Sequence, residues 1–206
     1  MGEFGDKESG DRAPRKPHKR REYAQRELRP IDAAQLQELA IGYAARYATT
    51  AVKLQRYLER KLKERRWTPA DAPDLPALVA RVVAAGFVDD RAFAAAKQRD
   101  LTARGVGLGR VKGALAAAGV SRDDVNAVLD EGDRAPDVPP YNPYASAIAF
   151  ARRRRFGPFA RDTGIDPARR NRELAAMARA GHAFAVARSV LMAADETAAL
   201  ELSDDG

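Results

Sequence analysis

Arginines crowd one short stretch of the chain, FARRRRFGPFARD, at residues 150–162. Guanidinium groups form strong paired hydrogen bonds with phosphates and carboxylates, so this stretch is a candidate binding site for nucleic acid or an acidic protein. Four adjacent residues of a helix point in four directions, so at least one of these arginines should be structural or partly stacked. The candidate contacts here and just downstream are Arg152, Arg153, Arg154, Arg155, Arg161, Arg169 and Arg170. The alternative is a solvated helix end, and we expect Phe156 and Phe159 to fill a core rather than stack on bases.

A second basic group surrounds the glycine-rich stretch Gly105-Val-Gly-Leu-Gly109. A dinucleotide fingerprint needs a preceding strand and the spacing G-x-G-x-x-G, and a phosphate loop needs Gly-Lys-Ser/Thr. Here a helical pattern precedes and the spacing differs, so we interpret the stretch as a loop between helices and expect no cofactor. Its amides and neighbouring cations are candidate contacts to phosphates or carboxylates. The cations in question are Arg99, Arg104, Arg110 and Lys112.

A third group of cations lies at helical spacing between residues 53 and 63. Its members are Lys53, Arg56, Arg60 and Lys63. Glu59 and Glu64 are available for local pairing, so a solvated helix face is the favoured interpretation, and a partner surface is the alternative.

Groups able to carry catalysis are scarce. The chain has no cysteine and two histidines, and it lacks the spaced ligands of a zinc site or a Ser-His-Asp order. The adjacent carboxylates Asp89-Asp90 and Asp123-Asp124 stand at expected helix starts, where capping explains them. We therefore expect a protein that is not an enzyme and has no catalytic residue and no metal.

Charge is distributed unevenly over the 206 residues. The net charge is +7, and residues 141–194 alone carry ten arginines against three acidic residues. The tail at 195–206 carries five acidic residues and no basic one. Such a field favours acidic partners such as nucleic acid. The lack of cysteine, of a signal-peptide pattern and of any apolar run of about 18 residues predicts a soluble cytoplasmic protein without membrane contact.

Helical periodicity and helix-capping residues dominate from Pro30 onward. Thr50, Asp74 and either Asp89 or Asp90 are expected N-caps, and Ser121 with Asp124 has the spacing of a capping box. Strand periodicity is almost absent. Helices recur in groups of three, each too small to bury much surface alone, so neighbouring groups must stack.

The fold class predicted is all-α: three tandem three-helix repeats forming an elongated, curved body, with a disordered basic N-terminal arm. The expected boundaries are the arm at 1–29, repeats at 30–88, 89–133 and 142–194, a proline-rich linker at 134–141 and an acidic tail at 195–206.

The central repeat carries a resemblance to a known family. The stretch GFVDDRAFAAAKQRDLTARGVGLGRVKGALAAAGVSRDDVNAVLDE, residues 86–131, resembles the pattern of the RecX regulatory proteins. ARRRRFGPF at 151–159 and AAMARAGHAF at 175–184 are similar to that family's third repeat, and the likeness extends over roughly 36–194.

The resemblance implies a negative regulator of the RecA recombinase. Such a protein binds RecA and its filament on single-stranded DNA, and suppresses ATP hydrolysis, strand exchange and coprotease activity. A monomer with weak direct DNA binding is expected. The alternative is a DNA-binding architectural or regulatory protein that acts without RecA through its basic residues.

Overall fold

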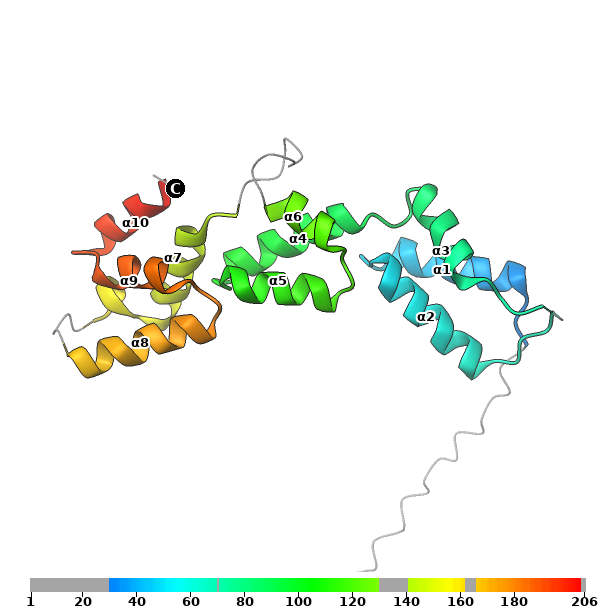
Figure 1. The fold of residues 1–206 in the computed structure, drawn as a ribbon, viewed down its shortest axis with the longest axis horizontal. Coiled ribbons are helices and arrows are strands. Elements are labelled where there is room, and N and C mark those ends of the chain that lie inside the picture. The colour runs from blue at the N-terminus through cyan, green and yellow to red at the C-terminus, as the bar shows by residue number, and fades with distance from the viewer. Residues whose placement is uncertain (1–29, 70, 130–140, 162–165, 205–206) are drawn as a thin grey trace, which may run out of the picture.

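The structure, a computed structural model, describes residues 30–69, 71–129, 141–161 and 166–204. In these ranges every regular element is a helix, and an isolated bridge between Ile31 and Trp67 is the one pairing of strand type. The predicted all-α class is therefore confirmed. The helices lie in three groups along an elongated row, with α1 to α3 at one end and α7 to α10 at the other (Figure 1).

The first group consists of α1 (Ala33–Arg46), α2 (Ala51–Glu64) and α3 (Leu75–Ala84). Leu54 and Leu58 of α2 are fully buried against the apolar faces of the other two helices. The predicted caps at Thr50 and Asp74 are confirmed, because each side chain accepts a hydrogen bond from the backbone N–H three residues ahead.

The second group consists of α4 (Asp90–Ala103), α5 (Leu108–Ala117) and α6 (Arg122–Leu129). Its separate core centres on Val111 and Leu115 of α5. Asp89, rather than Asp90, caps α4, and the predicted capping box of Ser121 and Asp124 forms.

The third group consists of α7 (Pro143–Arg154), the short 3₁₀ helix η1 (Gly157–Phe159), α8 (Pro167–Arg179) and α9 (Phe184–Met192). Met177, Val190 and Leu191 form the centre of its core. One core for each group of three helices is consistent with the predicted repeats.

The acidic tail holds a further helix, α10 (Glu196–Asp204), which sequence periodicity did not indicate. Ala199 is fully buried, and the side-chain amide of Asn142, the residue that caps α7, donates to the carbonyl of Ser203 at 2.7 Å. This helix packs against α7 and so belongs to the third group in space. The predicted arm at 1–29 and linker at 134–141, apart from Tyr141, lie outside the described residues.

The second helices of the three groups join end to end. At one junction, the N-cap residue Gly107 of α5 donates its N–H to the carbonyl of Ala180, the C-cap of α8, at 3.0 Å. At the other, the N-cap residue Thr50 of α2 donates its hydroxyl to the carbonyl of Ala118, the C-cap of α5, at 2.6 Å. We call the resulting line of α8, α5 and α2 the second-helix row; it follows the lower side of the molecule in Figure 1.

Each junction in the second-helix row brings the negative end of one helix dipole to the positive end of the next, which is a favourable arrangement. Both abutting C-termini end in a glycine with positive φ, Gly119 at 83° and Gly181 at 92°. The left-handed backbone ends the helix without a side chain, so the next helix can approach closely.

Candidate partner-binding surface

The four consecutive arginines have different surroundings, as helical geometry predicted. Arg152 pairs with Glu196 of α10. Arg153 donates to the backbone carbonyl of Arg104 at 2.7 Å and thereby ties α7 to the end of α4. The guanidinium of Arg154 lies 5.8 Å from the ring centroid of Phe150, and Arg155 forms the C-cap of α7 with a φ of 58°. All four are exposed, but Arg153 has an evident structural contact.

The aromatic residues beside them belong to the core. Phe150 is buried, and Phe156 and Phe159 are half-buried against the third hydrophobic cluster. The ring centroids of Phe150 and Phe156 lie 6.1 Å apart in an edge-on arrangement. The expectation that these phenylalanines fill a core is confirmed.

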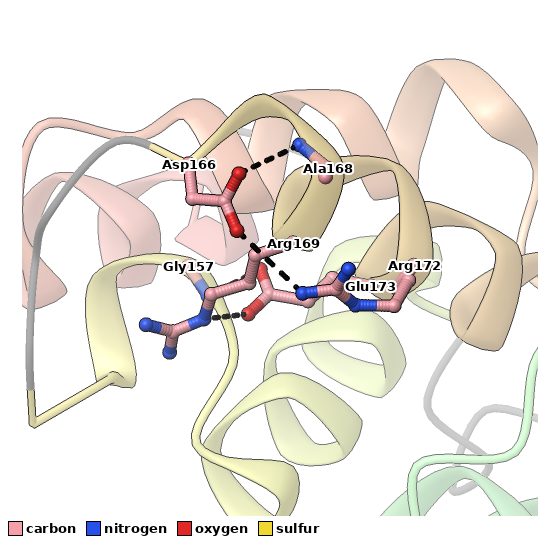
Figure 2. A network of polar contacts seen from close by, with 6 residues as sticks. All are labelled: Gly157, Asp166, Ala168, Arg169, Arg172 and Glu173. Atoms are coloured by element: carbon pink, nitrogen blue, oxygen red, sulfur yellow. Dashed lines mark hydrogen bonds and ion pairs between the residues drawn. The ribbon is translucent and has the colours of Figure 1, made fainter.

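Arg169 takes part in a buried polar network. Its Nε lies 2.9 Å from Glu173 Oε1, and the other oxygen of that buried carboxylate accepts the N–H of Gly157 at 3.1 Å. Figure 2 shows how these groups tie α8 to η1, with Asp166 capping α8 and reaching Arg172. Arg169 thus stabilises the third group.

Two other predicted residues lie near this network in the chain. Arg161 is exposed at the edge of the described range, and Arg170 is half-buried on α8.

The glycine-rich loop is a junction between the second and third groups. The N–H groups of Gly107 and Gly109 donate to the carbonyls of Ala180 and Gly181 at 3.0 and 3.2 Å. A Cβ on Gly107 would lie 2.2 Å from the carbonyl carbon of Gly181, so only glycine fits. These amides are occupied within the chain, which removes them as phosphate contacts. This role could not be read from the sequence, because the contacts join residues more than 70 positions apart.

His182 completes the same junction, although its position after a glycine C-cap indicated no special role in the sequence. It is buried, and its Nε2 lies 3.2 Å from the carbonyl oxygen of Gly105. Burial lowers the pKa of this imidazole, and the hydrogen bond to Gly105 acts in the opposite direction. The neutral ring is therefore favoured in the folded protein.

The basic residues around the glycine-rich loop point outward. Arg99, Arg110 and Lys112 are exposed, and no acidic partner occurs for them within the described ranges. Arg104 is exposed as well, but its guanidinium contacts Asp100 at 2.7 Å. The structure thus brings Arg104 and Arg153 together and leaves Arg110 and Lys112 open on α5.

Positive charge concentrates on the second-helix row. Together α2, α5 and α8 contain eleven lysines and arginines against three glutamates, whereas the third helices α3, α6 and α9 contain three against two aspartates. The sequence showed the basic stripe of residues 53–63 but not its alignment with α5 and α8, because the end-to-end junctions are long-range contacts.

Neither a metal centre nor a membrane span stands out in the part of the chain that the structure describes. No cluster of three or more His, Asp or Glu residues is placed there as metal ligands would be. None of the described helices has both the length and the apolar character needed to cross a bilayer.

Three helical groups joined in an elongated row are consistent with a helical-repeat protein. A scan of protein-family models finds no match. The chain is 32% identical over 186 residues to the regulatory protein RecX of Myxococcus xanthus (strain DK1622), and the match covers 88% of this chain and 97% of that relative. The chain therefore belongs to the family of RecX regulatory proteins.

Proposed function

We propose that this protein is a negative regulator of RecA that binds RecA and its filament on single-stranded DNA in the cytoplasm. It suppresses ATP hydrolysis, strand exchange and coprotease activity, and so acts in homologous recombination, DNA repair and the SOS response. Membership in the RecX family, over almost the whole length of a relative, is the observation that carries this proposal.

The second-helix row supports a binding mode along an extended, acidic partner. Eleven cations spread over three helices joined end to end can contact successive subunits of a filament or the phosphates that it carries. In this proposal the body bridges neighbouring RecA protomers and hinders their turnover. Arg110 and Lys112 stand at the middle of the row, and Arg99 and Arg104 stand close to them in sequence.

Co-sedimentation with RecA filaments assembled on single-stranded DNA tests this surface. The variant Arg110→Glu/Lys112→Glu changes two exposed residues near the N-terminus of α5, where carboxylates suit the helix dipole. We expect its affinity for the filament to fall at least about tenfold, because charge complementarity is reversed. The control Arg81→Glu/Arg122→Glu makes the same charge change on α3 and α6 and should bind like the wild type. Equal binding by both double variants would refute the assignment of this surface.

Direct DNA binding without RecA is the second candidate, and the high charge of the second-helix row favours it. In that case the protein binds bare DNA tightly, and its affinity falls steeply with salt because each neutralised phosphate releases counterions. Equal retention on bare DNA and on the RecA filament would favour this candidate over the first.

A further inference from the structure

A cleft of about 660 Å³ lies between α1 and α2, in the first helical group. Its walls combine three tyrosines with four cationic side chains. The eleven residues predicted above to bind a partner are all arginine or lysine and include no aromatic residue. The aromatic members are Tyr43, Tyr47 and Tyr57, and the cationic members are Arg46, Arg60, Lys61 and Arg65.

The three tyrosine rings form a series that leads from two half-buried rings to an exposed one. Tyr57 and Tyr43 stack with centroids 4.1 Å apart and an interplanar angle of 15°. Tyr43 in turn contacts Tyr47, with centroids 5.2 Å apart and a tilt of 47°. Tyr47 ends the series and is 55% exposed. A supported ring with an open face is a platform on which another planar ring can stack.

Four cationic side chains line the same cleft as the tyrosines. Arg60 and Lys61 lie 5.5 and 5.7 Å from the ring centroid of Tyr57, while Arg46 and Arg65 line the cleft from the ends of α1 and α2. Glu38 also lines the cleft, and Glu64 pairs with Lys61 at 2.6 Å and with Arg60 at 3.6 Å. Four cations against two carboxylates leave the cleft positive.

Gly42, in the middle of α1, lines the cleft without a side chain. A Cβ at this position would meet nothing within 4 Å, so packing does not require glycine here. A side chain here would extend into open space at the cleft, which glycine leaves free.

We propose that this cleft binds single-stranded nucleic acid, with an unpaired base stacked on Tyr47 and backbone phosphates beside Arg46, Arg60 and Arg65. An acidic peptide would satisfy the cations but offers a ring only where it contains an aromatic residue, whereas every nucleotide of a strand carries both a phosphate and a planar base, so the aromatic series favours a nucleic acid. This site deepens the second candidate function, direct DNA binding, because it adds a subsite for an unpaired base on the first helical group, and it does not rest on regulation of RecA.

The test compares two labelled strands of equal length and charge, an oligothymidylate and an abasic strand that has the same phosphates without bases. Binding is measured by fluorescence anisotropy with the full chain and no RecA. Stacking predicts that the wild type prefers the thymine strand on the order of tenfold, whereas phosphate contacts alone give no preference. Tyr47→Leu should abolish the preference and retain binding of the abasic strand, and Tyr47→Phe should keep the preference.

Phe87→Leu is the matched control, because Phe87 is another exposed aromatic residue of the first group, at 47% exposure. It should leave the preference intact. A wild type without base preference, or a Tyr47→Leu variant that keeps it, would overturn the proposal. A wild type that inhibits RecA but shows no base preference would overturn the cleft assignment alone, while base preference without RecA inhibition would overturn the proposed function alone.

Discussion

Two glycines of the second-helix row have opposite surroundings, which makes them a matched pair of probes. Gly107 is packed against the backbone of Gly181 and His182, and an added Cβ would lie 2.2 and 2.3 Å from their atoms. Gly113, in the middle of α5, has nothing within 4 Å of such a Cβ. One glycine serves the junction between helical groups, while the other only weakens its helix.

We therefore predict opposite effects for the two alanine variants. Gly107→Ala should lower the free energy of unfolding by about 1–3 kcal/mol, because α8 must move away. Gly113→Ala should raise it by about 0.5–1 kcal/mol through better helix propensity. Urea unfolding followed by circular dichroism measures both, and a stable Gly107→Ala variant would show that the junction is absent in solution.

His182 makes the junction between the second and third groups sensitive to pH. Burial lowers the pKa of the folded imidazole below its unfolded value of about 6.5. As the pH falls through that value, the unfolded chain takes up a proton that the folded chain excludes, so stability decreases. Asp90, whose pKa is raised by burial, has the opposite effect in a lower pH range.

The urea concentration at the unfolding midpoint should accordingly decrease as the pH is lowered from about 7.5 to about 5.5. His182→Gln keeps a side-chain donor for the carbonyl of Gly105 but cannot be protonated, so we expect a flatter pH profile. His182 is the only histidine among the described residues, which simplifies the attribution. An unchanged slope in the variant would contradict a buried neutral imidazole.

At the scale of the helix, Thr50 combines two roles in one hydroxyl. Its oxygen caps α2 by accepting the N–H of Lys53, and its proton bonds to the carbonyl of Ala118 in the next group. The residue is fully buried, so water cannot replace either bond. The cap therefore also joins the first and second groups.

Thr50→Val should lower the free energy of unfolding by about 2–3 kcal/mol, because it removes the cap and leaves a buried carbonyl without a donor. Thr50→Ser keeps the hydroxyl and loses one methyl group, so its cost should stay near 1 kcal/mol. Thermal or urea unfolding distinguishes the two substitutions. Similar losses in both would mean that the methyl group, and not the hydroxyl, stabilises this junction.

The helix α10 places a carboxylate beside the first of the four arginines. Glu196 pairs with Arg152, and both side chains are largely exposed. Glu196→Gln should free that arginine and raise affinity for single-stranded DNA, by no more than about fivefold because exposed ion pairs are weak. Glu201→Gln on the same exposed helix makes the same charge change away from that pair, and should show a smaller effect. Equal increases in DNA affinity for the two variants would indicate that the net charge of the protein, and not the pair of Glu196 and Arg152, determines the affinity.

Local signals predicted the helices well. Thr50, Asp74, Asp89 and Ser121 cap helices where their side chains and the following apolar spacing indicated. Helix α10 was not anticipated, because its short acidic segment has little periodicity and gains its apolar contacts from α7.

Contacts between distant residues limited the prediction of the surface. Helical geometry indicated that one of the four arginines is structural, but only the fold identifies Arg153 and its partner at Arg104. The stacked tyrosines come from two helices, so the spacing within either helix could not reveal them.

At the scale of the whole molecule, the end-to-end junctions turn three small groups into one extended body. No group has a large core of its own. The α5–α8 junction contributes backbone hydrogen bonds, the α2–α5 junction contributes the bonds of the capping Thr50 hydroxyl, and both contribute tight glycine contacts. The same junctions align the basic second helices over the length of the row (Figure 1). Such a body can engage several repeating units of a filament at once, whereas a compact domain of this size would engage fewer.

The rate of DNA-dependent ATP hydrolysis by RecA from the same source, with this protein titrated from far below to equal stoichiometry, tests the central claim most directly. We predict inhibition of the hydrolysis rate. Inhibition well below one molecule per RecA would indicate action at filament ends, and inhibition only near saturation would indicate coating of the filament. An unchanged rate across the whole titration, with salt-sensitive binding of bare DNA intact, would contradict the regulator of RecA and favour a protein that acts on DNA alone.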